Sequence, residues 1–78
     1  MLFLIEYDRD LGRNVTIESF HHSDRGRAEQ SRLKLELTLR QQGVEHEVVL
    51  LDAASEEALR RTHRRYFEDL AELATVPG

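Results

Sequence analysis

The chain has 78 residues, of which 11 are lysine or arginine and 15 are aspartate or glutamate, so its formal net charge is −4. This balance excludes a generally basic surface of the kind that binds nucleic acid, although it leaves room for a local basic patch. Since the chain has no cysteine, it can form neither a disulfide framework nor a thiolate zinc site. A single domain of this size has a small core, and oligomerisation is the remaining route to further stability.

The first five residues are apolar, but the run ends at Glu6. It is too short to cross a membrane, and it lacks the basic segment that opens a signal peptide. We therefore expect a soluble, cytoplasmic protein with no membrane partner.

Residues 1–8 and 15–20 have the pattern of a β-hairpin. Apolar side chains occupy both faces of the first segment, with Phe3 and Ile5 on one face and Leu2 and Leu4 on the other, which is typical of a central strand. Residues 9–14 supply turn chemistry, and β-branched side chains then return in the second segment.

A long helix follows, from a cap at Ser23 or Asp24 to about Gln42. Either capping side chain can accept a backbone N–H bond, and Gly43 can adopt the left-handed conformation that ends a helix. Residues 44–52 then alternate as a third strand, with apolar side chains on both faces.

Four leucines alternate strictly inside the helical segment, so no helix can bury them all on one side. At about 100° per residue, Leu33 and Leu37 share one face, while Leu35 and Leu39 join Ala28 on nearly the opposite face. One pair should face the chain's own sheet and the other should meet a second surface. We therefore expect a homo-oligomer, with a dimer favoured, whose interface is drawn from these five residues. An unknown protein partner is the alternative.

Strict alternation is also the native pattern of a strand, so residues 33–39 could instead form a hairpin with residues 44–51. Most residues of the segment are strong helix formers, and Thr38 alone favours a strand. Summed propensity therefore favours the helix.

A second helix is expected after Ser55, which can cap it, with Glu56 and Glu57 at the positive end of the helix dipole. Its buried stripe recurs at spacings of three and four and has Phe67 at its edge. The stripe comprises Leu59, Thr62, His63, Tyr66, Leu70 and Leu73. Residues 74–78 would form a flexible tail, which leaves residues 1–73 as one domain.

These elements predict an α+β fold of order ββαβα. We expect a three-stranded antiparallel sheet of order 2-1-3, with the first strand central and both helices on one face. The other face would then carry uncovered leucines or valines, which is a second reason to expect an oligomer.

The last helix carries the strongest basic patch, and a nucleic-acid-associated regulator is therefore the second functional hypothesis. Its contacts would be Arg60, Arg61, Arg64, Arg65 and Tyr66, through phosphates and base stacking. Each arginine also has a carboxylate four residues away. Such pairs contribute about 0.2–0.5 kcal/mol each and describe a solvated helix face, so nucleic-acid binding ranks behind assembly.

A small metal-dependent enzyme is the third hypothesis. Its candidate ligands are His21, His22, His46 and His63, but no pair has the spacing of a known histidine metal motif. Glu6 and Asp8 share a strand face and could gather with Asp10 at the strand end, where acidic residues are also ordinary turn formers. We see no nucleophile with a base and no phosphate-binding glycine loop. The sequence therefore predicts a small interaction or assembly module with neither catalytic site nor cofactor.

Overall fold

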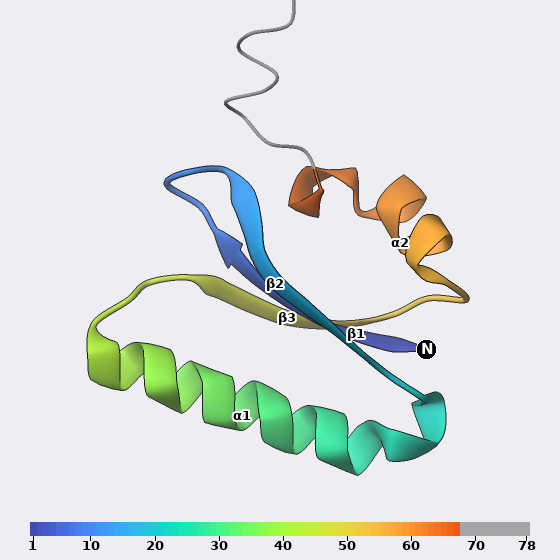
Figure 1. Ribbon diagram of the computed structural model, residues 1–78, viewed down its shortest axis with the longest axis horizontal. Helices are drawn as coiled ribbons and strands as arrows, with labels where there is room; N and C mark the ends of the chain where they lie inside the picture. The colour runs from blue at the N-terminus through green and yellow to red at the C-terminus, as the bar shows by residue number, and fades with distance from the viewer. Residues whose placement is uncertain (68–78) are drawn as a thin grey trace, which may run out of the picture.

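The computed structural model describes residues 1–67 and confirms the predicted order of elements (Figure 1). The elements are β1 (Leu2–Asp8), β2 (Arg13–Phe20), the 3-10 turn η1 (His22–Asp24), α1 (Arg25–Gln42), β3 (Glu47–Asp52), α2 (Glu56–Thr62) and the 3-10 turn η2 (Arg64–Tyr66). The predicted tail at residues 74–78 and the stripe positions Leu70 and Leu73 lie outside the described residues.

Strand β1 is the centre of a three-stranded antiparallel sheet, and the predicted strand order is confirmed. Ile5 of β1 pairs with Ile17 of β2 on one side and with Val49 of β3 on the other. Residues 2–7 are all buried, as the apolar character of both faces of this segment indicates.

The two helices lie on opposite faces of the sheet, so the prediction that they share one face is wrong. Helix α1 covers the face that carries Leu2 and Leu4, whereas α2 and η2 cover Phe3, Ile5 and Tyr7. Figure 1 shows α1 on one side of the strands and α2 on the other. Because both faces of β1 are apolar, each needs a cover, and each helix supplies one. The sheet face that we expected a second copy to bury is covered by the chain itself.

Residues 33–39 lie within α1, which confirms the helical interpretation of the leucine-rich segment. Gly43 ends the helix at a φ of 70°, and its N–H donates to the carbonyl of Arg40. The N-terminal end of α1 differs from the prediction. Asp24 occupies the cap position without a capping side-chain bond, and in the preceding turn the Nδ1 atom of His21 accepts the N–H of Ser23.

Helix α2 begins as predicted, because the Oγ atom of Ser55 accepts the N–H of Ala58 at 3.1 Å. It ends earlier than predicted, at Thr62, whose side chain is exposed and does not belong to a buried stripe. The break and the η2 turn that follows bring Tyr66 onto the sheet, where its ring meets that of Tyr7 edge to face with centroids 5.2 Å apart.

Candidate functional site

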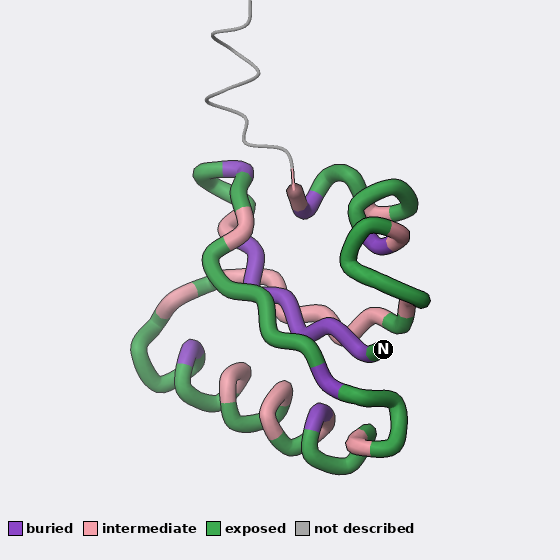
Figure 2. The backbone as a smooth tube through the Cα atoms, turned by 45° about the vertical axis from the view of Figure 1, so that its right-hand side comes forward, coloured by how far each residue is buried: buried purple, intermediate pink, exposed green. Residues whose placement is uncertain are grey.

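The outer face of α1 carries two exposed leucines. Leu33 is 53% exposed and Leu37 is 56% exposed, and they lie one helical turn apart. Figure 2 shows that the buried and half-buried positions of α1 face the sheet, while the opposite side of the helix is exposed. Within residues 1–67, nothing covers this pair of leucines. We call Leu33 and Leu37 the outer leucine pair.

The other three residues of the predicted interface face the chain's own sheet. Ala28 is fully buried in the cluster with Leu2 and Leu4, and Leu35 packs against that cluster. Leu39 is also buried, at 8% exposure. Ala28 is therefore covered by β1 and is not available to a second copy, contrary to its place in the predicted interface. The structure narrows the candidate interface to the outer leucine pair.

The arginines of the last segment have partners within the chain. Arg60 pairs with Glu56 at 3.1 Å and Arg61 pairs with Glu57 at 2.7 Å, as the four-residue spacing predicts. Arg64 is exposed in η2. The carboxylates that we expected to pair with Arg64 and Arg65, at positions 68 and 69, lie outside the described residues.

Arg65 and Tyr66 instead meet Glu47, at the start of β3. The guanidinium of Arg65 donates to the Glu47 carboxylate at 2.8 Å, and the hydroxyl of Tyr66 donates to the same oxygen at 3.0 Å. Tyr66 is only 5% exposed. Since its ring is buried against Tyr7, Tyr66 is not presented for stacking on a base, and the nucleic-acid hypothesis loses its aromatic contact.

Because of the contact with Glu47, Arg65 should contribute more to stability than Arg61, although the two arginines have the same pattern in the sequence. Arg65→Ala should lower the free energy of unfolding by about 1 kcal/mol, because it leaves the half-buried Glu47 carboxylate with fewer donors. Arg61→Ala should change it by less than about 0.5 kcal/mol, since both members of the Arg61–Glu57 pair are highly exposed. Urea denaturation of the two variants measures the difference, and equal effects would show that the Glu47 contact contributes nothing.

The Glu47 contact also shifts the pKa values of its members. Desolvation raises the pKa of the Glu47 carboxyl, but hydrogen bonds from Tyr66 and Arg9 and the charge of Arg65 outweigh it, so this pKa lies below its ordinary value of 4.5. Burial and the hydrogen bond to Glu47 raise the pKa of the Tyr66 phenol above its ordinary value of 10.0.

Because of these two pKa shifts, the free energy of unfolding should fall at both low and high pH. A carboxyl with a lowered folded pKa stabilises the fold above its unfolded pKa, and this contribution is lost as the pH falls through the folded value. A phenol with a raised folded pKa stabilises the fold below its unfolded pKa, and this contribution is lost as the pH rises through the folded value.

We therefore expect the contribution of the Glu47 contact to the free energy of unfolding to be level from about pH 5.5 to about pH 9 and to fall on both sides. Urea titrations across this range measure it. Tyr66→Phe should flatten the alkaline fall and leave the acid fall in place, because Asp8, whose pKa is lowered by the N–H groups of Leu11 and Asp10, also contributes on the acid side. An alkaline fall that is as steep in Tyr66→Phe as in the wild type would contradict the assignment.

A second polar cluster joins β1 to the segment before β3. The Nδ1 atom of His46 lies 2.5 Å from a carboxylate oxygen of Glu6, and its Nε2 atom lies 3.4 Å from a carboxylate oxygen of Asp8. The sequence placed Glu6 and Asp8 on one strand face, and His46 brings them together, whereas Asp10 makes no contact with this ring. Glu6 is 7% exposed, so His46 is the partner that satisfies a buried carboxylate.

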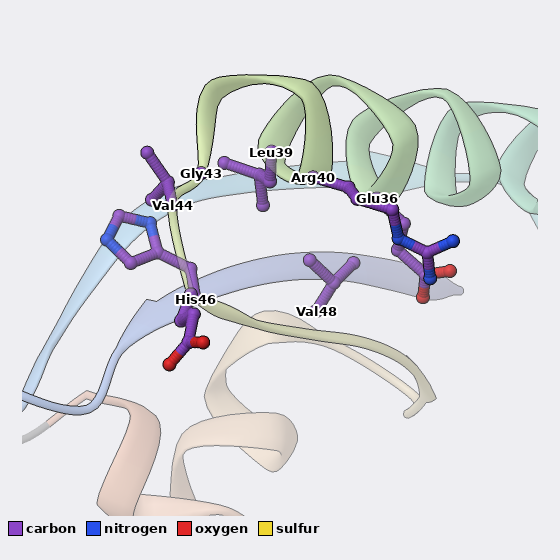
Figure 3. A pocket seen from close by; sticks show the side chains of 8 residues that line it. Glu36, Leu39, Arg40, Gly43, Val44, His46 and Val48 are labelled. Atoms are coloured by element: carbon purple, nitrogen blue, oxygen red, sulfur yellow. The ribbon is translucent and has the colours of Figure 1, made fainter.

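His46 also lines a cavity of about 450 Å³ between α1 and β3. Figure 3 shows Leu39 and Val48 on its opposite walls, with Val44 and His46 at one end. Its other lining residues are Glu36, Arg40, Gly43 and Glu45. The cavity is open and mixed in polarity, and the ring nitrogens of His46 are directed at carboxylates of its own chain.

The remaining histidines are dispersed over the fold. The rings of His21 and His22 lie beside each other, with centroids 4.2 Å apart. His63 stacks near Tyr66, with ring centroids 6.4 Å apart. Among residues 1–67, no three histidine, aspartate or glutamate side chains form a group that could hold a metal ion.

Glu47 is the residue that sequence reasoning missed. It shares a strand face with Val49 and Leu51, so it is a single charge on an otherwise apolar face. A charge in such a position needs a buried or half-buried partner, and this signal was available in the sequence.

Comparison with protein-family models, characterised proteins and solved structures found no match to this chain. In the part of the chain that the structure describes, neither helix combines the length and apolar character that crossing a bilayer requires.

Proposed function

We propose that this protein is a small assembly module that pairs with a second copy of itself through the outer face of α1. The outer leucine pair carries the proposal. Single exposed leucines are ordinary on protein surfaces. Here, however, two lie one turn apart on a helix whose opposite face is already buried in the chain's own core. Such a helix has two apolar faces and one intramolecular partner.

The energy of the contact is compatible with a dimer of moderate affinity. Burial of an exposed leucine contributes about 1.5–3 kcal/mol at most, and a symmetric pair of helices would bury four of them. This gain must exceed the loss of translational and rotational freedom on association. Because each leucine is already partly covered, we expect dissociation constants in the micromolar range rather than below it.

The open edge of β2 is the competing apolar surface. Val15 and Ile17 are exposed there, but the pairing of β1 with β2 shifts register between Glu6 and Tyr7. This shift leaves Val15 as an extra residue in β2. A bulge of this kind interrupts the regular ladder that strand addition needs, and natural proteins use bulges to protect edges. The outer face of α1 is the better candidate.

The arginine face gives less support to the nucleic-acid alternative. Arg60 and Arg61 are paired with carboxylates of their own helix, and Arg65 is bound to Glu47. Use of this surface for phosphates would require breaking contacts that already exist.

Sedimentation equilibrium tests the proposal. We expect the wild type to associate between about 10 and 200 micromolar, and the double variant Leu33→Glu/Leu37→Glu to remain a monomer with an unchanged far-ultraviolet helix signal. Val15→Glu/Ile17→Glu is the matched control, because it replaces two exposed apolar residues on β2 by the same charges and should leave association intact. A monomeric wild type at the highest concentration contradicts the proposal, as does loss of association in the β2 variant alone.

A further inference from the structure

The outer edge of β3 carries backbone groups without partners, because β3 is an edge strand of the sheet. Beside its end, the amine of Met1 donates to the carbonyl of Ala53 at 2.8 Å, and the N–H of Ala53 donates to the carbonyl of Met1 at 2.9 Å. In an antiparallel ladder, hydrogen-bonded pairs of this kind alternate with non-bonded ones. By the observed register, residues 47, 49 and 51 bond to β1, and the N–H and C=O groups of residues 48, 50 and 52 point away from the sheet. Within residues 1–67, no group bonds to them.

The side chains of β3 are also incompletely covered. Strand β1 has a neighbour on each side, and residues 2–7 are all buried, whereas residues 48–51 of β3 are all half-buried. Val48 and Leu50 border the core beneath α1, and Val49 and Leu51 border the core beneath α2. Both cores therefore end at β3 with apolar surface that a further strand would cover.

This edge lacks the protection that the edge of β2 has. The pairing of β1 with β3 runs without a register shift from Leu2 opposite Asp52 to Tyr7 opposite Glu47, whereas β2 carries a bulge. Residues 47–52 contain neither proline nor lysine, and their charges lie only at the two ends. A regular apolar edge of this kind is a template on which another extended chain can pair.

The cavity between α1 and β3 adjoins the same edge. Leu39 and Val48 form opposite walls of this cavity (Figure 3). Residues that lie directly opposite each other in a ladder direct their side chains to the same face of the sheet. In a strand added to β3, the residue opposite Val48 would therefore direct its side chain toward this cavity. Recognition by strand addition combines main-chain bonds with a pocket for an alternate side chain, and this edge offers both.

The charges around the edge balance one another. Acidic side chains of β3 and of the facing side of α1 each have a basic group within 4.0 Å. These pairs are Glu47 with Arg65, Asp52 with the N-terminal amine, and Glu36 with Arg32. Glu45 and Arg40 also line the cavity, and their charges are opposite. The edge is therefore complementary to an uncharged segment, because a charged one would bring an unbalanced charge to an apolar strand.

We propose that the outer edge of β3 binds an extended, uncharged and largely apolar segment of a partner protein as a fourth strand, antiparallel to β3. The backbone of this segment bonds to residues 48, 50 and 52, and a side chain of about leucine size opposite Val48 enters the cavity. This function goes beyond self-association and uses a separate surface, because the outer leucine pair takes no part in it.

A second copy of the chain fits this edge less well than a single strand does. In an antiparallel pair of two β3 strands, the residue opposite Val48 is Asp52 when the two-fold axis passes through Leu50, and it is Leu50 when the axis passes through Val49. Asp52 is charged, and Leu50 is already packed in the core beneath its own α1. Neither side chain is suited to fill the cavity of the other copy.

A titration with a defined peptide tests the proposal. The probe is acetyl-Ser-Thr-Val-Thr-Leu-Thr-Ser-amide, an uncharged peptide that places its leucine opposite Val48 when its valine lies opposite Leu50. We expect amide shifts and slower hydrogen exchange at Val48 and Leu50 in ¹H–¹⁵N spectra, with a dissociation constant between about 50 micromolar and 1 millimolar. Unchanged spectra at about 2 millimolar peptide would overturn the proposal.

Two N-methylated peptides distinguish strand addition from general apolar contact. The N–H of the third residue, valine, faces β3 in the proposed pair, so its methylation should weaken binding at least about tenfold. The N–H of the fourth residue, threonine, faces away from β3, so its methylation should change the dissociation constant by less than about twofold. Equal effects of the two methylations would overturn the proposal.

Exchange of the fourth and fifth residues of the peptide tests the cavity. The composition stays the same, but the leucine then points to the face of α2 instead of the face of α1. We expect binding to weaken at least about threefold. Binding that is unchanged or tighter would overturn the role of the cavity in selecting the segment.

Hydrogen exchange of the free protein shows whether the edge is open. The amides of residues 48 and 50 should exchange faster than those of residues 49 and 51, which bond to β1. Equal protection of all four amides before the peptide is added would show that this chain or a second copy already covers the edge, and it would overturn the proposal.

The variant Leu33→Glu/Leu37→Glu separates this proposal from self-association. It should bind the peptide with the dissociation constant of the wild type, because the outer leucine pair is not part of the edge. A monomeric wild type that binds the peptide would remove self-association alone. A dimeric wild type that does not bind it would remove only the strand-addition proposal.

Discussion

Replacement of Leu59 with alanine is expected to lower the free energy of unfolding by about 2–5 kcal/mol. Leu59 is fully buried between α2 and the sheet, in the cluster that contains Phe3, Ile5 and Tyr66. Its removal opens a cavity beneath a helix of only seven residues, which has few other contacts with which to hold its position. In a domain this small, the loss is comparable to the whole stability.

Urea denaturation followed by circular dichroism measures this effect. Leu11→Ala is the matched control, because Leu11 lies exposed in the hairpin turn and should change the free energy of unfolding by less than about 0.5 kcal/mol. A loss in Leu59→Ala as small as that of the control would show that α2 does not cover the sheet in solution.

His46→Ala is expected to have the second largest effect on stability, a loss of about 2–3 kcal/mol. The substitution removes the partner of Glu6 and leaves a nearly buried carboxylate on β1, opposite Val48 of β3. The cost therefore arises from the stranded charge more than from the lost contact.

A second substitution separates these causes. Glu6→Gln in the His46→Ala background removes the stranded charge and should recover part of the loss. His22→Ala, at an exposed histidine, is the control and should change stability by less than about 0.5 kcal/mol. If His46→Ala loses no more than His22→Ala in urea denaturation, the Glu6 carboxylate is not buried as the structure shows.

The topology of the sheet could be predicted because β1 is apolar on both faces. A strand of this composition needs a neighbour on each side and a cover on each face, and the hairpin turn supplies one neighbour directly. The helical connection between β2 and β3 sets the direction of the third strand. These constraints are local or follow from short connections. The composition and spacing of the sequence are therefore sufficient to predict the strand order.

The face that each helix covers could not be predicted in the same way. Strand parity shows that Phe3 and Ile5 share one face and Leu2 and Leu4 the other, but it assigns no helix to either. The connection from β3 to α2 is long enough to place the helix on either side of the sheet. In the structure, the hydrogen bond between Tyr66 and Glu47 holds the segment after α2 on the face of Phe3 and Ile5. This contact joins residues 19 positions apart, so no local pattern predicts it.

The sequence of α1 also contains a signal that shows which pair of leucines faces the sheet. The alternation of the leucines predicts two apolar faces on α1, but it does not show which pair of leucines faces the sheet. Ala28 carries that information, because it adds a small buried residue to the face of Leu35 and Leu39 and lets the helix approach β1 closely. The face with more apolar members is the core face, and the smaller set is left outside.

The central claim is that Leu33 and Leu37 of one copy contact a second copy. The most direct measurement is a methyl NOE experiment on a sample in which half of the chains are labelled, so that only contacts between copies are observed. We predict intermolecular NOEs from the methyl groups of Leu33 and Leu37 and none from those of Leu35 and Leu39. A spectrum with no intermolecular NOEs from the outer leucine pair, at a concentration where sedimentation shows a dimer, would contradict the account.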